Sequence, residues 1–264
     1  MVERLSRRNR TRQEKLDLEA ARGSLTLQEY ADAFRLDRAF LRRLGLRTGT
    51  DPRNGRAFVE VPYKNAGGHV VAIRRRHALK GPRRFTWRPG DKPILYGRTY
   101  LRRFRECGFA TLVEGESDCH VLWSHRFPAL GLPGATTWKD EWATGLEGLR
   151  IFVVQEPDQG GETLVAKLAR SPLADRLRVV RLEGAKDPAQ LHVKDPDAFR
   201  ERFKAALSAA VRLPTPDQVP PPTPDRARPE IARQRPSERI VIDRAAAHRA
   251  GEALAVVRAF VRHE

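Results

Sequence analysis

The chain has 264 residues, which is enough for one or two domains with hydrophobic cores. Its only cysteines, Cys107 and Cys119, are too few for a disulfide framework or a four-cysteine zinc site, so we expect no zinc. Because no apolar run has the length of a membrane span and the N-terminus lacks a signal-peptide apolar region, the sequence predicts a soluble, cytoplasmic protein without a membrane partner.

The net charge of +17 is distributed unevenly along the chain. Residues 1–110 hold 27 basic and 11 acidic side chains, a net charge of +16, whereas residues 111–212 have a net charge of −1. A basic region beside an acidic one predicts nucleic-acid binding. The alternative is an arginine-rich coding bias on solvated surfaces, with 41 Arg and 9 Lys. Such a bias explains the preference for Arg but not the shortage of acids in one half.

The first part of the chain predicts a basic arm and a small basic α+β domain. The arm, residues 1–22, is either a flexible segment that contacts phosphates or simply a disordered terminus. In the domain, residues 23–108, Thr26 is a good helix N-cap with Glu29 three residues later. The apolar pattern indicates two short helices broken at residues 36–37, followed by strands at residues 57–62, 69–74 and 84–88.

The middle of the chain, residues 109–212, alternates apolar runs with helical patterns, which predicts β-α units around a parallel sheet flanked by helices. The expected strands are 109–113, 129–132, 151–154 and 177–182. The expected helices are 98–107, 118–125, one holding Trp138 and Trp142, one beginning at Gly161, and 197–212.

The last 52 residues have no core pattern until near the end. Residues 213–237 form a Pro-rich linker, and residues 238–264 predict a C-terminal helix after a short strand. The apolar side of this helix indicates docking, either on its own chain or on a partner.

Two acidic motifs follow apolar runs of the predicted parallel sheet. The first is Glu114-Gly115 with Asp118, and the second is Glu156 with Asp158. Carboxylates at the carboxyl ends of neighbouring parallel strands converge, and they repel one another unless a cation lies among them. Oxygen ligands favour Mg²⁺, with Mn²⁺ as a substitute, and such sites serve phosphate chemistry. The alternative for a single acid such as Asp118 is an ordinary helix N-terminal carboxylate.

Aromatic residues alternate with basic ones just after the predicted strand pair. Phe85 and Trp87 lie among Arg84, Arg88 and Lys92. This pattern suits stacking and phosphate contacts with a single-stranded nucleic acid, or it places the aromatic rings in the core and the charges on the surface. We expect core positions for the rings and ligand contacts for the basic side chains.

Together the two acidic motifs resemble the toprim domain of bacterial-type DNA primases, topoisomerases and several nucleases. The family's Glu-Gly-x-x-Asp is matched by Glu114, Gly115 and Asp118. Its Asp-x-Asp-x-x-Gly corresponds to Glu156, Asp158 and Gly161, with Glu replacing the first Asp. Residues 186–188 resemble the Lys-Asp-Pro-Asp of primase toprim domains, but Ala189 replaces the last acid.

Segments ahead of these motifs are similar to primases rather than to other toprim proteins. Residues 61–76 resemble a strand pair that ends in a functional arginine, and residues 84–97 resemble a segment with basic groups near nucleotide and template. The whole run from residue 25 to residue 211 looks like toprim proteins of phages, plasmids and mobile elements. The resemblance therefore implies synthesis of short RNA primers on single-stranded DNA from ribonucleoside triphosphates.

The resemblance also implies roles for individual residues. Catalysis would rest on Glu114, Glu156 and Asp158, and the metal ligands would be these three with Asp187. Asp118, Gly115 and Gly161 would support the ligands from behind, and the nucleotide or DNA would be held by Arg76, Arg84, Arg88, Lys92 and Lys186. The C-terminal helix would be a site for a replicative helicase.

Several features expected of relatives are missing from this sequence. It has no Cys/His zinc module and no Walker loop for a fused helicase. Its four tyrosines all lie in the basic N-terminal region, which disfavours a topoisomerase. A toprim nuclease and a non-catalytic DNA-binding module of replication or recombination remain the alternatives to a primase.

Overall fold

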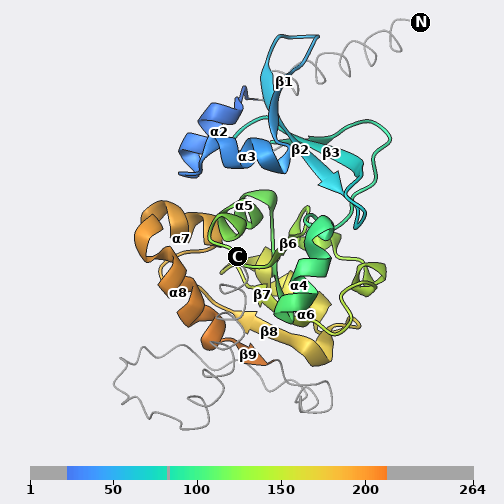
Figure 1. The fold of residues 1–264 in the computed structure, drawn as a ribbon, viewed down its shortest axis with the longest axis vertical. Coiled ribbons are helices and arrows are strands. Elements are labelled where there is room, and N and C mark those ends of the chain that lie inside the picture. Colours follow the sequence, from blue (N-terminus) through green and yellow to red (C-terminus); the bar gives the residue numbers. More distant parts are fainter. Residues whose placement is uncertain (1–22, 82–83, 213–264) are drawn as a thin grey trace, which may run out of the picture.

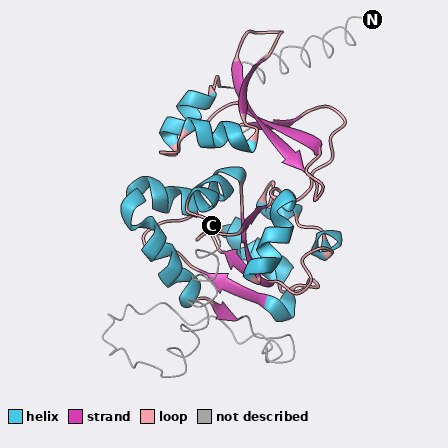
Figure 2. Ribbon diagram, viewed as in Figure 1, coloured by secondary structure: helices cyan, strands magenta, loops and turns pink. Residues whose placement is uncertain are grey.

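The structure is a computed structural model, and it describes residues 23–81 and 84–212 (Figures 1 and 2). These residues form an antiparallel sheet with two short helices, followed by a larger parallel sheet between helices. The predicted arm at residues 1–22, the linker at 213–237 and the C-terminal helix at 238–264 lie outside the described residues.

The N-terminal part has the α+β character that the sequence predicts. Its helices are α2 (Leu27–Ala33) and α3 (Arg38–Leu44), and its strands, adjacent in the order of the chain, are β1 (Arg47–Thr50), β2 (Ala57–Lys64), β3 (Val70–Arg76) and β4 (Phe85–Trp87). Thr26 and Glu29 form the predicted capping box at the start of α2. Asp37 caps α3 and thereby separates the two helices.

The second sheet has the strand order β6-β5-β7-β8-β9. Its strands are β5 (Phe109–Val113), β6 (Ala129–Gly131), β7 (Arg150–Val154), β8 (Leu177–Val180) and β9 (Val211–Arg212). The first four pair in parallel and β9 is antiparallel. The predicted parallel sheet flanked by helices is therefore confirmed.

Helices cover both faces of this sheet, so the fold has three layers (Figure 1). The helices are α4 (Leu101–Cys107), α5 (Glu116–Ser124), α6 (Gln159–Leu168), α7 (Pro188–Lys194) and α8 (Pro196–Ser208). Alternate residues of β5 enter different cores: Phe109 and Val113 pack with α5, α7 and α8, whereas Ala110 and Leu112 pack with α4 and α6. Alternation of this kind is what a strand buried on both faces requires.

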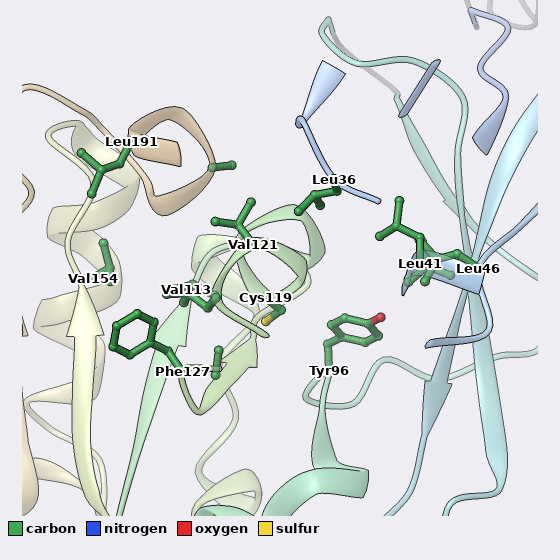
Figure 3. Close-up of a cluster of buried hydrophobic side chains, with 14 of the residues drawn as sticks. Leu36, Leu41, Leu46, Tyr96, Val113, Cys119, Val121, Phe127, Val154 and Leu191 are labelled. Carbon is green, nitrogen blue, oxygen red and sulfur yellow. The ribbon is translucent and has the colours of Figure 1, made fainter. Parts of the chain in front are cut away.

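One hydrophobic core joins the N-terminal part to the parallel sheet. Leu36, Leu41 and Leu46 belong to the same cluster as Val121 and Val113 (Figure 3). Because this cluster runs across residues 108 and 109, the division of the chain into domains at that point stays a prediction.

Several details differ from the sequence-based expectations. Trp138 and Trp142 are buried, but Trp138 follows a 3₁₀ turn and Trp142 lies within another, so neither is on an α-helix. The last helix ends at Ser208 instead of reaching Arg212, because the chain turns back to form β9. Helix α7 was not predicted. Over the described part of the chain, no helix combines the length and apolar character that crossing a membrane requires.

Candidate active site

Four carboxylates follow three adjacent parallel strands. Glu114 comes directly after β5, Glu156 and Asp158 follow β7, and Asp187 follows β8. These strands are neighbours in the order β5-β7-β8, so their carboxyl ends bring the side chains together as predicted. We call Glu114, Glu156, Asp158 and Asp187 the acidic cluster.

Helix caps fix two of these side chains. Asp158 is the N-cap of α6, and its Oδ1 accepts a hydrogen bond from the Gly161 N–H at 3.0 Å. Asp187 is the N-cap of α7, and its Oδ1 accepts from the Gln190 N–H at 2.6 Å. One oxygen of each carboxylate thus orients the side chain through the helix cap, and the second oxygen takes no part in the cap.

Glu114 is the member of the cluster with an unsatisfied hydrogen-bond acceptor. Its Oε1 is buried and has no hydrogen-bond partner among the described residues. Its Oε2 and the Asp158 Oδ1 both lie within 4 Å of the point where a Cβ on Gly160 would be. Burial, and after it the charges of Glu156 and Asp158, raise the pKa of Glu114 to about 7.

Lys186 supplies the positive charge of the cluster. Its Nζ lies 2.9 Å from the Glu156 Oε2 and 3.1 Å from the Asp187 Oδ2. Burial opposes the charged form, but the two carboxylates outweigh it and raise the pKa of Lys186. Burial raises the pKa of Glu156, and Lys186 counteracts this shift only in part. The structure therefore places Lys186, which we expected to bind nucleotide, directly on two of the acids.

Asp118 lies behind the cluster and joins two helices. It is buried in α5, and its Oδ1 accepts a hydrogen bond from the Ala189 N–H of α7 at 3.0 Å. Burial, with the nearby charge of Asp187, raises the pKa of Asp118 well above its usual range. Ala189, which stands where primases have a second acid, thus contributes its backbone N–H to the site's support.

Close packing explains the glycine of the second motif but not that of the first. A Cβ on Gly161 would lie 2.2 Å from the Glu156 carbonyl oxygen, so only glycine lets α6 begin this close to Glu156. A Cβ on Gly115 would meet Asp118 at 3.5 Å, an ordinary contact. Of these two glycines, Gly161 is therefore the one that the local packing requires.

Two buried polar contacts near the cluster were not predicted from the sequence. Glu116, in the first turn of α5, accepts a hydrogen bond from Arg74 Nη1 at 2.7 Å and another from the Tyr63 hydroxyl. Burial alone would raise the pKa of Glu116, but these two partners lower it overall. His120 lies 2.8 Å from the hydroxyls of both Tyr30 and Tyr96. The partners in each contact are at least 24 residues apart in the sequence, so no local sequence pattern predicts these contacts.

The basic residues expected to hold nucleotide or DNA differ in their surroundings. Arg76 is buried, and it donates hydrogen bonds to the carbonyl oxygens of Ala78 and Leu79. Arg84 is exposed, and burial together with the like charges of Arg76 and Arg74 lowers its pKa. The remaining two are exposed: Arg88, which pairs with Asp91, and Lys92.

The donor set fits a divalent ion only in part. Carboxylate oxygens are the ligands that Mg²⁺ prefers, and the unpartnered Glu114 Oε1 is an oxygen without a donor. Within residues 23–81 and 84–212, however, no three His, Cys, Asp or Glu side chains form a ready-made metal site. A site for Mg²⁺ therefore needs further oxygens from water or phosphate.

Solved structures of primase domains are similar in fold to this chain. The *Aquifex aeolicus* primase (zinc-binding and RNA polymerase domains) superposes with a TM-score of 0.58 at 17% identity, covering 70% of this chain and 56% of that chain. A DnaG primase catalytic domain bound to single-stranded DNA gives a TM-score of 0.56 at 17% identity, covering 70% and 71%. The chain thus has the toprim-type fold of primase catalytic domains, and it spans little more than half of the *Aquifex* structure.

The sequence itself is similar to a phage protein. The Gene 57 protein of Mycobacterium phage D29 is 28% identical over 144 residues, which are 54% of this chain and 91% of that protein. No family model matches the chain. The chain thus combines the fold of primase catalytic domains with sequence similarity to a phage protein.

Proposed function

We propose that this chain is a primase-type nucleotidyltransferase that makes short RNA primers on single-stranded DNA. The observation that carries the proposal is the convergence of Glu114, Glu156, Asp158 and Asp187 at the strand ends of a primase-like fold. The solved DnaG domain bound to single-stranded DNA supports the choice of template. Ribonucleoside triphosphates would be the second substrate.

The chain's own residues divide the work. Glu114 and Asp158 would hold Mg²⁺, or Mn²⁺ in its place, and Glu156 and Asp187 would add negative charge beside it. When bound, this ion supplies charge neutralisation at the triphosphate and activation of the attacking hydroxyl. Asp118 holds the start of α7, and with it Asp187, at a fixed distance from α5 through Ala189. The acids therefore stay aligned without relying on a ligand.

The exposed basic side chains of the N-terminal part would bind phosphates. Arg84, Arg88 and Lys92 would contact the template backbone or the triphosphate, because guanidinium and ammonium groups pair with phosphate oxygens. Arg76 would act less directly, since its own hydrogen bonds go to backbone carbonyl oxygens and its charge lies close to Arg84. A replicative helicase would be a partner of the C-terminal segment.

One assay separates this function from its rivals. The full chain is incubated with single-stranded template, labelled ribonucleotides and Mg²⁺. Primer-sized products support the proposal, shortening of the template indicates a nuclease, and DNA binding without turnover indicates a non-catalytic module.

The variant Asp158→Ala tests whether the acidic cluster carries the activity. We expect product to fall at least about 100-fold with DNA binding retained, because a metal ligand is lost while the basic surface is unchanged. Glu162→Ala is the matched control, since Glu162 is an exposed acid in the first turn of the same helix. Equal product from wild type and Asp158→Ala would exclude the cluster as the catalytic centre.

A further inference from the structure

A lysine lies where the acidic cluster is most crowded. The Lys186 ammonium contacts Glu156 Oε2 at 2.9 Å and Asp187 Oδ2 at 3.1 Å, so it bridges carboxylates that follow two different strands. Both carboxylates are largely buried, with side chains 11% and 14% exposed, whereas Lys186 enters from solvent at 51% exposed. The ammonium therefore occupies the position between these two carboxylates that a bound cation would take.

The other half of the cluster has no such partner. Glu114 Oε1 is buried without a hydrogen bond among the described residues, and Glu114 Oε2 lies on the same side as Asp158 Oδ1, next to Gly160. No contact of Lys186 with Glu114 or Asp158 is as short as its ion pairs with the other two acids. The cluster thus has a lysine-filled half, Glu156 with Asp187, and an open half, Glu114 with Asp158.

Charge favours a single divalent ion in this arrangement. Four carboxylates and one ammonium leave three negative charges, which one divalent ion reduces to one. A second divalent ion would make the centre positive and would lie beside the ammonium, whose like charge opposes its binding.

We propose that Lys186 is the resident cation of the Glu156–Asp187 half, so that the cluster takes one divalent ion, held by Glu114 and Asp158. One or two protein carboxylates suffice for Mg²⁺ when water or substrate phosphates supply the remaining oxygens. This inference rests on the proposed function only in requiring that a divalent ion binds to the cluster at all.

The test is to count bound ions in the full chain, with Mn²⁺ alone as the probe. Mn²⁺ is titrated into the protein, and the free ion is measured by its electron paramagnetic resonance signal. We expect one ion per chain in wild type, none in Asp158→Ala, and two in Lys186→Met, because removal of the ammonium opens the second half. Lys186→Arg retains a cation and is expected to stay at one.

Lys139→Met is the matched control. Lys139 also pairs with a carboxylate, that of Glu141, and its side chain is 53% exposed, close to the 51% of Lys186. It therefore loses the same charge at a similar exposure but away from the acidic cluster, and we expect one ion per chain. Should Lys186→Met prove unstable, Lys186→Gln repeats the experiment with a polar side chain.

The outcomes separate this inference from the proposed function. Two ions in wild type, or one ion in a folded Lys186→Met, would overturn the single-ion arrangement and leave a metal-dependent enzyme in place. No bound Mn²⁺ in any variant would overturn both. An unchanged count in Lys139→Met together with a doubled count in Lys186→Met supports the assignment.

Discussion

Glu116 is only two residues from Glu114, but its carboxylate is bound by residues of the N-terminal part. Its partners, Arg74 and Tyr63, come from strands of the antiparallel sheet, so a buried ion pair ties the start of α5 to the N-terminal part. The side chains of Arg74 and Glu116 are only 11% and 3% exposed. Burying both charges costs desolvation energy, and the pair stabilises the fold only while both partners are present.

Arg74→Met is therefore expected to destabilise the protein by about 3–5 kcal/mol, because it leaves the Glu116 carboxylate buried without its counter-charge. The measurement is the free energy of unfolding from urea denaturation. The double variant Arg74→Met/Glu116→Leu removes both charges and should recover most of the loss. If the double variant were as unstable as Arg74→Met alone, the destabilisation would come from lost packing and not from the unpaired charge.

The sequence identified the acids of the cluster but not the buried ion pair made by the neighbouring Glu116. Glu114, Glu156, Asp158 and Asp187 could be predicted because each follows an apolar run in a recognisable motif. The contact of Glu116 with Arg74 joins residues 42 positions apart and has no local signal. Pairings of this kind depend on how the two sheets pack, and packing leaves no periodic pattern in the chain.

At the scale of elements, Gly161 allows helix α6 to pack closely against the preceding backbone. Its first turn lies against the backbone of Glu156, where a Cβ on Gly161 would be 2.2 Å from a carbonyl oxygen. A backbone atom cannot move aside as the end of a flexible side chain can. If position 161 carried a side chain, the start of α6 would therefore have to shift, and Asp158 and Glu156 would shift with it.

Gly161→Ala is expected to cost about 1–3 kcal/mol of unfolding free energy through overpacking. Gly160→Ala is the neighbouring control, because its Cβ would meet the Asp158 Oδ1 at 3.1 Å, and this is a side-chain atom. We expect the smaller loss there, measured by urea denaturation of both variants side by side. Equal losses would mean that the α6 backbone adapts, and that the contact with Glu156 does not limit position 161.

Long buried elements were predictable from the sequence, and short polar ones were not. The strand predicted at residues 109–113 matches β5, and the one at 151–154 differs from β7 by one residue, because uninterrupted apolar runs mark both. Strand β1 has the sequence Arg-Thr-Gly-Thr, which carries no apolar alternation. In helix α7 the two large apolar residues, Leu191 and Val193, are two positions apart, which is not a helical spacing. Both form because neighbouring elements supply their partners.

At the scale of the whole molecule, His120 links helix α2 of the N-terminal part to the segment that pairs with the edge of the parallel sheet. Its ring lies between the hydroxyls of Tyr30, on α2, and Tyr96, which pairs with the edge strand β6. A neutral imidazole has one donor and one acceptor nitrogen, so it satisfies both hydroxyls at once. Burial is the main reason why the pKa of His120 is lowered to about 3, and the positive charge of Arg76 contributes.

This shift makes the fold sensitive to acid. The pKa of His120 is about 3 in the folded protein and about 6.5 in the unfolded chain, so the unfolded chain binds the proton between these values. The contribution of neutral His120 is present above pH 6.5 and is lost as the pH falls toward 3. Over the whole window it amounts to up to about 5 kcal/mol.

His120→Gln removes this titration, and its amide retains a donor and an acceptor for the tyrosine hydroxyls. We expect the variant to be less stable than wild type at pH 7 but to lose less free energy of unfolding between pH 6.5 and 4, measured by urea denaturation at each pH. His69→Gln is the control, since His69 is exposed in the loop between β2 and β3 and its replacement removes a histidine without touching a buried contact. Parallel pH profiles for wild type and His120→Gln would show that His120 is not the acid-sensitive link between the N-terminal part and the parallel sheet.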